Sequence, residues 1–220
     1  MQSGHSQKRG DTKVVTSEDG LATVGVIVAH PDDETLWAGG TMLMHPGWRC
    51  SVFALCRAND PDRSPRFFQA LRAYRATGGM ADLDDSPDQP PLPASLVEQT
   101  VLSLAGETAY DLLLTHGPTG EYTRHLRHRE TFRAVAALWE TGALRARELW
   151  LFAYEDGGGA YPPRARSDAG LTFSLSQEIR AEKYRIMREV YGFSAESWEA
   201  RATPKVEAFH WFKSPQELPV

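Results

Sequence analysis

The chain has 220 residues, of which 41% are hydrophobic, and carries a formal net charge of -5 at pH 7. This length and a mean hydropathy of -0.42 suit one well-filled globular domain and exclude a largely disordered chain. The acidic balance and the lack of a Lys/Arg cluster argue against a nucleic-acid partner, and no apolar run reaches the length of a membrane span.

The N-terminal segment and the two cysteines bear on the cellular compartment in which the protein is expected. We expect residues 1–20 to form a flexible tail, because residues 1–11 are polar and lack the apolar region of a signal peptide. Residues 21–220 are then expected to form a single domain. Cys50 and Cys56 bracket a strand-like stretch that holds them beyond disulfide reach. Reduced cysteines favour a cytoplasmic protein, and the lack of an apolar run of membrane-spanning length argues against a membrane partner.

The first strong pattern is an apolar run that stops at a histidine, a proline and three acids. The β-branched run over residues 24–29 predicts a strand buried on both faces, which ends at His30. Pro31 and the acids after it are typical of a helix start, and the helix is expected to continue to residue 44. Asp32 and Asp33 therefore lie where a strand turns into a helix, the usual place for a site in an open α/β sheet.

This turn has two interpretations. It can be a capping turn with a histidine satisfied by its neighbours. Alternatively, His30 and Asp33, three residues apart, can point at one centre, and both side chains are common zinc ligands. A catalytic zinc ion usually has three protein ligands, so this second interpretation requires another ligand from elsewhere in the chain.

The remaining elements alternate between strand and helix patterns. In chain order we expect a strand over 50–56, a polar loop over 57–65, a helix over 64–77 ended by Gly78 and Gly79, an acidic surface loop over 80–93, a helix over 94–105, a strand over 110–115, a helix over 129–141, a strand over 148–153, a long loop over 154–170, a helix over 175–191 and a strand over 206–212. Such βαβ units predict an α/β fold, a Rossmann-like three-layer sandwich with a mainly parallel central sheet.

A second group of histidines follows the strand over 110–115. His116 ends that strand and either lines a pocket or only closes the strand. After a Gly/Pro loop, His125 and His128 stand three apart at a helix start and share one face. A solvated helix turn would explain this pair alone. Together with His30 and Asp33, which also follow a parallel strand, the pair is better explained by a metal site.

These residues resemble the PIG-L/LmbE family of zinc-dependent N-deacetylases, which act mainly on N-acetylglucosamine-type amides. The resemblance covers roughly residues 23–212 and rests on two motifs. They are Ala29-His30-Pro31-Asp32-Asp33-Glu34, and Thr115-His116 followed by Gly120-Glu121-Tyr122 and His125-Leu126-Arg127-His128. It implies a metal-dependent hydrolase that removes an acetyl or other acyl group from an amide nitrogen, releasing acetate and a free amine.

The resemblance also implies roles for single residues. It implies one zinc ion bound by His30, Asp33 and His128, with Asp32 as general base and His125 facing the oxyanion and the leaving amine. We expect His125 to be protonated, so that it can donate to the departing amine. The implied substrate-binding residues are Arg66 and Tyr122, and His116 is a further candidate for the pocket lining. A His/His/Asp ligand set would suit Fe²⁺ or Co²⁺ as well as Zn²⁺.

The chain departs from the family pattern in three places. Leu126 and Arg127 stand where the family commonly has Pro-Asp, so the acid that tunes His125 must come from elsewhere or be missing. Two residues separate Tyr122 from His125, where one is more usual, and residues 67–69 replace glutamates that often follow the substrate arginine.

Two other functions stay open. One is a metal-retaining sugar-binding or regulatory protein with weak or no turnover. The other is a hydrolase of phosphoesters, which would normally need a second metal ion and more carboxylates. The expected partner is a small N-acetylated amino-sugar conjugate. The sequence leaves the acyl group, the aglycone and the oligomeric state, including a homo-oligomer, undecided.

Overall fold

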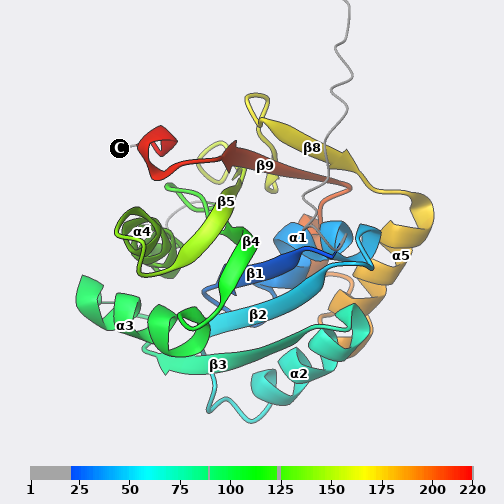
Figure 1. The fold of residues 1–220 in the computed structure, drawn as a ribbon. Coiled ribbons are helices and arrows are strands. Elements are labelled where there is room, and N and C mark those ends of the chain that lie inside the picture. Colours follow the sequence, from blue (N-terminus) through cyan, green and yellow to red (C-terminus); the bar gives the residue numbers. More distant parts are fainter. Residues whose placement is uncertain (1–20, 89, 123–124, 220) are drawn as a thin grey trace, which may run out of the picture.

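The computed structural model describes residues 21–88, 90–122 and 125–219, and these form a three-layer α/β sandwich (Figure 1). The predicted fold class is thereby confirmed. The central seven-stranded sheet has the order β3-β2-β1-β4-β5-β9-β8. Strands β1 to β5 are mutually parallel, whereas β9 is antiparallel to β5 and β8 is antiparallel to β9. The tail expected over residues 1–20 lies outside the described residues.

The sheet strands are β1 (Thr23–Val28), β2 (Arg49–Cys56), β3 (Thr77–Leu83), β4 (Ala109–Thr115), β5 (Arg145–Phe152), β8 (Leu171–Ser174) and β9 (Val206–Phe212), and a separate small pair is formed by β6 (Tyr154–Glu155) and β7 (Arg164–Ala165). The helices are α1 (Asp33–Met44), α2 (Arg63–Tyr74), α3 (Ala94–Ala105), α4 (Leu126–Glu140), α5 (Gln177–Arg185) and α6 (Trp198–Ala202), with a π-helical turn η1 (Ile186–Val190) and a 3₁₀ turn η2 (Pro215–Glu217). None of the described helices is long and apolar enough to cross a membrane.

Two hydrophobic layers hold the sandwich together. Helices α1, α2 and α5 lie on one side of the sheet, and α3 and α4 lie on the other (Figure 1). Along β1, Val26 and Val28 pack into the first layer, while Ile27, pointing the opposite way, packs into the second. Because helices cover both faces, β1 is a continuous apolar run rather than an alternating one. The same burial keeps Cys50 and Cys56 inside as free thiols.

The strand order has a switch point at β1 and β4. β1 pairs with β2 on one side and with β4 on the other, so the strand order reverses at this point. The connections after β1 and β4 lead to α1 and α4, which lie on opposite faces of the sheet. Ligands of open α/β sheets bind at such a switch point, outside the carboxyl ends of the strands. His30 follows β1 and His116 follows β4, so both residues lie at this edge.

The segment after α2 differs from the prediction. Gly78 and Gly79 do not end a helix; they lie within β3, an edge strand parallel to β2 that takes up the start of the expected surface loop. The prediction was wrong because this strand contains only one β-branched residue, Thr77, and resembles a turn in composition. Gly78 has φ 156°, and a Cβ atom there would lie 1.8 Å from the Val52 carbonyl oxygen. The glycine therefore allows close approach of the neighbouring strand.

The C-terminal third is more divided than predicted. The helix expected over 175–191 is the shorter α5 followed by η1, and the expected long loop contains β6 and β7. Strand β8 and helix α6 were not predicted at all. Both are short, and β8 is recognisable as a strand only through its antiparallel pairing with β9.

Candidate metal centre

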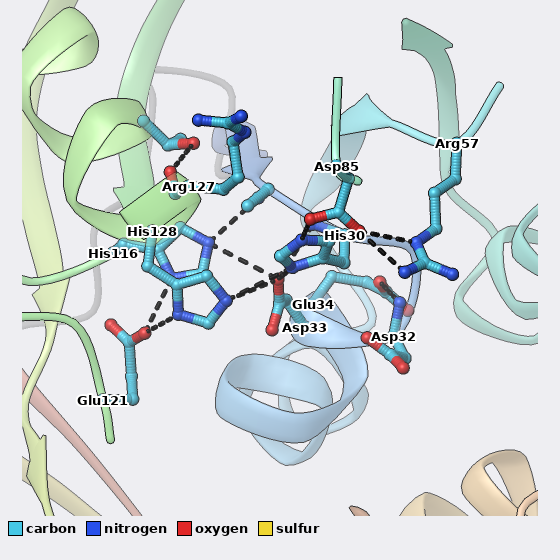
Figure 2. Close-up of polar contacts among 12 residues, drawn as sticks. His30, Asp32, Asp33, Glu34, Arg57, Asp85, His116, Glu121, Arg127 and His128 are labelled. Atoms are coloured by element: carbon cyan, nitrogen blue, oxygen red, sulfur yellow. Dashed lines mark hydrogen bonds and ion pairs between the residues drawn. The ribbon is translucent and has the colours of Figure 1, made fainter. Parts of the chain in front are cut away.

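Three side chains converge at the carboxyl ends of β1 and β4 (Figure 2). His30 Nδ1 lies 3.1 Å from Asp33 Oδ2, and His128 Nε2 lies 3.2 Å from the same oxygen. The two ring nitrogens are 3.3 Å apart. His30 comes from the turn after β1, Asp33 from the first turn of α1 and His128 from the first turn of α4. The fold thus brings together the three residues named above as metal ligands.

The spacing of these donor atoms suits a tetrahedral cation. Ligand atoms at about 2.0 Å from a tetrahedral zinc ion are about 3.3 Å from one another, close to the separations of 3.1 to 3.3 Å found here. His30 and Asp33 are less than a tenth exposed, and His128 is fully buried. Two imidazoles and one carboxylate are a common donor set for a catalytic ion with an open position.

Each of the two histidines is oriented by a further carboxylate. His128 Nδ1 lies 2.6 Å from Glu121 Oε2, and His30 Nε2 lies 3.0 Å from Asp85 Oδ1. With a metal ion bound, each carboxylate would hold the N–H on the outer ring nitrogen and leave the lone pair of the inner nitrogen for the ion. Metal-bound histidines are almost always held by a partner of this kind. Neither Glu121 nor Asp85 was predicted as a site residue.

The charged groups of the cluster could hold a cation. Burial alone would lower the pKa of His128, but Asp33 and Glu121 raise it to about 10. Burial alone would raise the pKa of Glu121, but His116 and His128 lower it to about 2. The two buried carboxylates therefore hold a positive charge between them. A divalent ion that displaces the His128 proton would supply positive charge at the same place.

His116 lies beside this cluster but is committed to other contacts. Its Nδ1 lies 2.8 Å from Glu121 Oε2, and its Nε2 accepts the Ala29 N–H at 2.9 Å. The ring is fully buried and does not line the cavity next to the cluster. Both nitrogens are thus occupied in the neutral ring. Of the two interpretations of His116, the geometry favours a residue that closes the strand and orients Glu121 over one that binds substrate.

Other donor combinations in the described residues overlap with the first. His30, His125 and His128 could also surround an ion, as could Asp33, His116 and His128. Both combinations contain His128, so they describe alternative positions for one ion rather than two separate sites. His116 is the weaker donor because its lone pair accepts the Ala29 N–H. We therefore favour His30, Asp33 and His128 as the ligands, because Asp85 and Glu121 contact the outer ring nitrogens of the two histidines and leave the inner nitrogens facing Asp33.

Asp32 lies next to the cluster in a strained conformation. Its φ is 132°, a value that side-chain-bearing residues rarely adopt. The Asp32 N–H donates to Glu34 Oε2 at 3.0 Å, and the Tyr191 hydroxyl donates to Glu34 Oε1 at 2.7 Å. Burial, together with the neighbouring Asp33 charge, raises the pKa of Asp32 well above its usual range. The Asp32 carboxyl is thereby held at the cavity wall in a state that favours accepting a proton.

His125 stacks on His128, with ring centroids 4.2 Å apart, and its Nδ1 is buried without a hydrogen-bond partner. Burial and the neighbouring histidines lower the pKa of His125 to about 3. This shift favours the neutral ring, whereas the sequence led us to expect a protonated one, and that expectation stays a prediction. Arg127, which replaces the usual aspartate, points away and donates to the carbonyls of Asp84 and Pro90. Among the described residues, no acid hydrogen-bonds His125 Nδ1.

A cavity of about 330 Å³ opens beside the cluster. Its lining includes His30, Asp32, Asp33, Leu36, Arg57, Arg63, Asp85, Tyr122, His125, Trp198 and Glu199. Tyr122 is therefore in reach of a ligand, as predicted for its position, although its role stays a prediction. Arg66 is absent from this lining. Its Nε donates to Asp62 at 2.8 Å, and its Nη1 donates to the Val190 carbonyl at 3.1 Å.

The arginine that lines the cavity is Arg63, three residues earlier on α2. Its guanidinium lies 4.4 Å from the centre of the Phe193 ring, and its Nη1 is buried without a hydrogen-bond partner, 3.9 Å from Asp32 Oδ2. Arg63 and Arg66 stand on nearly the same helix face, so spacing alone does not distinguish them. Contacts with the distant segment around Phe193 decide which arginine faces the cavity.

No family model and no curated protein matches the sequence. Among solved structures, the fold is similar to N,N'-diacetylchitobiose deacetylase from Pyrococcus horikoshii, with 14% identity, a TM-score of 0.63, and coverage of 87% of this chain and 84% of that one. It is also similar to a triple mutant of a deacetylase of the teicoplanin pathway, with 16% identity, a TM-score of 0.62, and coverage of 87% and 98%.

These neighbours are deacetylases of the PIG-L/LmbE type, so the resemblance stated from the motifs is confirmed at the level of the fold. The same fold also carries other chemistry. The fold is also similar to that of a 4-carboxy-2-hydroxymuconate hydratase from Pseudomonas putida, with 12% identity and a TM-score of 0.55. The match covers 86% of this chain and 95% of that one. Because the fold serves both activities, it does not decide the function, which depends on the residues of the site.

Proposed function

We propose that this protein is a metal-dependent N-deacetylase that hydrolyses the amide of an N-acetylglucosamine-type substrate and releases acetate and a free amine. The observation that carries the proposal is the group of donor atoms on His30, Asp33 and His128, with outer carboxylates on both histidines. Zn²⁺ is the proposed ion, and Fe²⁺ or Co²⁺ would suit the same donors.

A divalent ion held by these residues supplies positive charge that polarises the amide carbonyl and makes water more acidic. Asp32 is close enough to the cluster to take the proton of the attacking water on its carboxylate, because it lines the cavity and does not belong to the donor group. As the water oxygen bonds to the carbonyl carbon and the carbon–nitrogen bond breaks, Asp32 returns this proton to the amide nitrogen. Its raised pKa makes the carboxylate a stronger base for the first transfer.

His125 is proposed to stabilise the oxyanion of the substrate as a neutral hydrogen-bond donor. Its Nδ1 is buried and has no partner within the described residues, so a ligand atom would satisfy it. Fixed hydrogen-bond donors directed at a developing oxyanion supply a large share of the transition-state stabilisation in acyl transfer. Tyr122, with its ring centre 5.3 Å from that of His125, is proposed to border the same position. Arg63, rather than Arg66, is proposed to hold the polar part of the substrate.

The rival hypotheses are less well supported by the site. A two-metal phosphoesterase would need a second, separate group of metal ligands. Both further donor combinations in the described residues contain His128, so they do not form a second site. A sugar-binding protein without turnover would have no use for Asp32, which the structure holds in a strained conformation facing the cavity.

The experiment that tests this proposal measures acetate release by the purified protein from a panel of N-acetylglucosamine derivatives, with metal content counted per chain. Release is expected with one ion per chain, should stop on chelation and should return with Zn²⁺, Fe²⁺ or Co²⁺. Bound metal without release from any member of the panel would contradict the proposal and favour the sugar-binding hypothesis. More than one ion per chain would favour the two-metal hydrolase.

A further inference from the structure

A buried carboxylate next to the metal centre has no part in the chemistry proposed above. Glu34 is fully buried, and it accepts hydrogen bonds from three donors, none of which carries a positive charge. We infer that Glu34 and Tyr191 are positioning residues, which hold Asp32 in the conformation that its proton transfers require. The inference rests on the proposed function and adds to it the contacts that place the general base.

The backbone groups on both sides of the Asp32 Cα atom are fixed. Glu34 Oε2 accepts the Asp32 N–H at 3.0 Å (Figure 2), and the Leu36 N–H donates to the Asp32 carbonyl at 2.8 Å. The carbonyl thus belongs to the first turn of α1 and cannot rotate without breaking that turn. The direction of the N–H therefore sets the φ of Asp32, which is 132°. Without Glu34 as acceptor, φ should return to an ordinary negative value.

The other oxygen of Glu34 is held by two hydroxyl groups. Oε1 accepts from the Thr35 hydroxyl at 2.6 Å and from the Tyr191 hydroxyl at 2.7 Å. Thr35 is the next residue of α1, whereas Tyr191 is a buried residue 157 positions after Glu34. A buried carboxylate is costly unless its oxygens are hydrogen-bonded. Loss of the Tyr191 hydroxyl would therefore weaken the contact that keeps the Glu34 carboxylate beside the Asp32 N–H.

The π-helical turn η1 presents Tyr191 to Glu34. The Tyr191 N–H donates to the Ile186 carbonyl, five residues earlier, at 3.0 Å. Such a turn contains more residues than an α-helical turn, so it changes the direction in which the next side chain points. π-helical turns are rare, and they occur frequently at functional sites. Here the turn directs the Tyr191 ring toward α1, where its hydroxyl reaches Glu34.

Arg66 supports the end of this turn from outside the cavity. Its Nη1 donates to the Val190 carbonyl at 3.1 Å. Gly192 has φ 77°, and a Cβ atom there would lie 2.3 Å from the same Arg66 nitrogen, so this position requires a glycine. These contacts fix the residues on both sides of Tyr191. They also give Arg66 a structural role, in place of the substrate contact expected from the sequence.

The test measures kcat and KM for acetate release from methyl N-acetyl-β-glucosaminide, with metal content counted on the same preparation. Tyr191→Phe should lower kcat about tenfold and leave KM and metal content unchanged, because a displaced base transfers protons less well. In the Asp32→Asn background the same substitution should change the residual kcat by less than about twofold, because the group that it displaces is gone. Tyr184→Phe is the matched control, because Tyr184 is 40% exposed on α5.

Glu34→Ala is a second variant, which removes the acceptor itself and should lower kcat at least as much as Tyr191→Phe. Wild-type kcat in either variant would overturn the inference. An equal fall caused by Tyr191→Phe in both backgrounds would also overturn it, because Tyr191 would then not act through Asp32. Loss of metal from Tyr191→Phe would mean that the tyrosine supports the metal ligands instead.

Crystal structures, which need no turnover, separate this inference from the proposed function. The wild type should show Asp32 with φ near 132°, and Tyr191→Phe should show it with an ordinary negative φ. This result in a protein that releases no acetate would support the positioning and contradict the deacetylase. Acetate release by a wild-type protein whose Tyr191→Phe variant keeps the positive φ would overturn the positioning and leave the deacetylase standing.

Discussion

Asp32 shows most clearly how one residue is prepared for a chemical role. Only three non-glycine residues in the described chain have positive φ, and Asp32, at 132°, lies furthest from the ordinary left-handed region. Glu34 accepts the Asp32 N–H and is itself held by a hydrogen bond from the hydroxyl of Tyr191, which lies 157 positions later in the sequence. Strain of this kind persists only where surrounding contacts enforce it, and it gathers at functional sites.

The proposed role of Asp32 gives the first prediction. Asp32→Asn should lower kcat for acetate release by at least about a hundredfold, because an amide cannot accept the proton of water, while metal content stays at the wild-type value. Acetate assays and metal analysis on the same preparation test both halves. Asp88→Asn, in an exposed position, is the control. A variant with wild-type kcat would remove Asp32 from the role of general base.

Glu121 gives a second prediction at the residue scale. Its carboxylate contacts the rings of His116 and His128 and accepts the Gly117 N–H at 2.9 Å. Glu121→Gln weakens the group that orients His128, so the dissociation constant for Zn²⁺ should rise by about 10- to 100-fold. Competition with a chelating indicator measures this constant. Unchanged zinc affinity would show that Glu121 does not support a metal ligand.

At the scale of elements, α1 is held by a buried polar network that reaches into its middle. Lys183 of α5 donates to the Leu36 carbonyl at 2.9 Å and lies 2.6 Å from Glu207 Oε1. Glu207 of β9 accepts the N–H groups of Gly40 and Thr41 at 2.7 and 2.6 Å. These contacts bind peptide groups within α1 to two distant elements. Since Asp33 opens α1, they also fix where the proposed ligand stands.

This network predicts a large effect on stability. Lys183→Met leaves the Glu207 carboxylate buried without its cation, so the free energy of unfolding should fall by about 3–5 kcal/mol. The double variant Lys183→Met/Glu207→Gln should recover part of that loss. Urea denaturation measures both, and Lys205→Met, at an exposed lysine, is the control. A loss below about 1 kcal/mol in the single variant would mean that the carboxylate is not held by this lysine.

At the scale of the whole molecule, the inner part of the sheet was predictable and its edges were not. β1, β2, β4 and the second half of β5 are apolar runs, because burial on both faces imposes such composition. The first half of β5 is polar and partly exposed, and its start was not predicted. β3 lies at the edge with glycines in its interior, and β8 has only four residues. Their identity as strands comes from pairing with neighbours, which local sequence does not encode.

The same distinction applies to the site. His30, Asp33 and His128 were predictable because they stand in short motifs directly after strands or at helix starts. Asp85 was not, because it is one of several acids in a loop and only the fold brings it to His30, 55 positions away in sequence. Arg63 and Trp198 reach the cavity through contacts between distant segments. Motifs therefore predict the reacting centre better than they predict the walls around it.

The central claim is that His30, Asp33 and His128 hold one catalytic ion, and an anomalous-difference map tests it most directly. For crystals grown with Zn²⁺ and measured at the zinc edge, we predict a single strong peak per chain. It should lie about 2.0–2.2 Å from His30 Nδ1, His128 Nε2 and an Asp33 carboxylate oxygen. A crystal without such a peak, or with the ion on residues other than these three, would contradict the account.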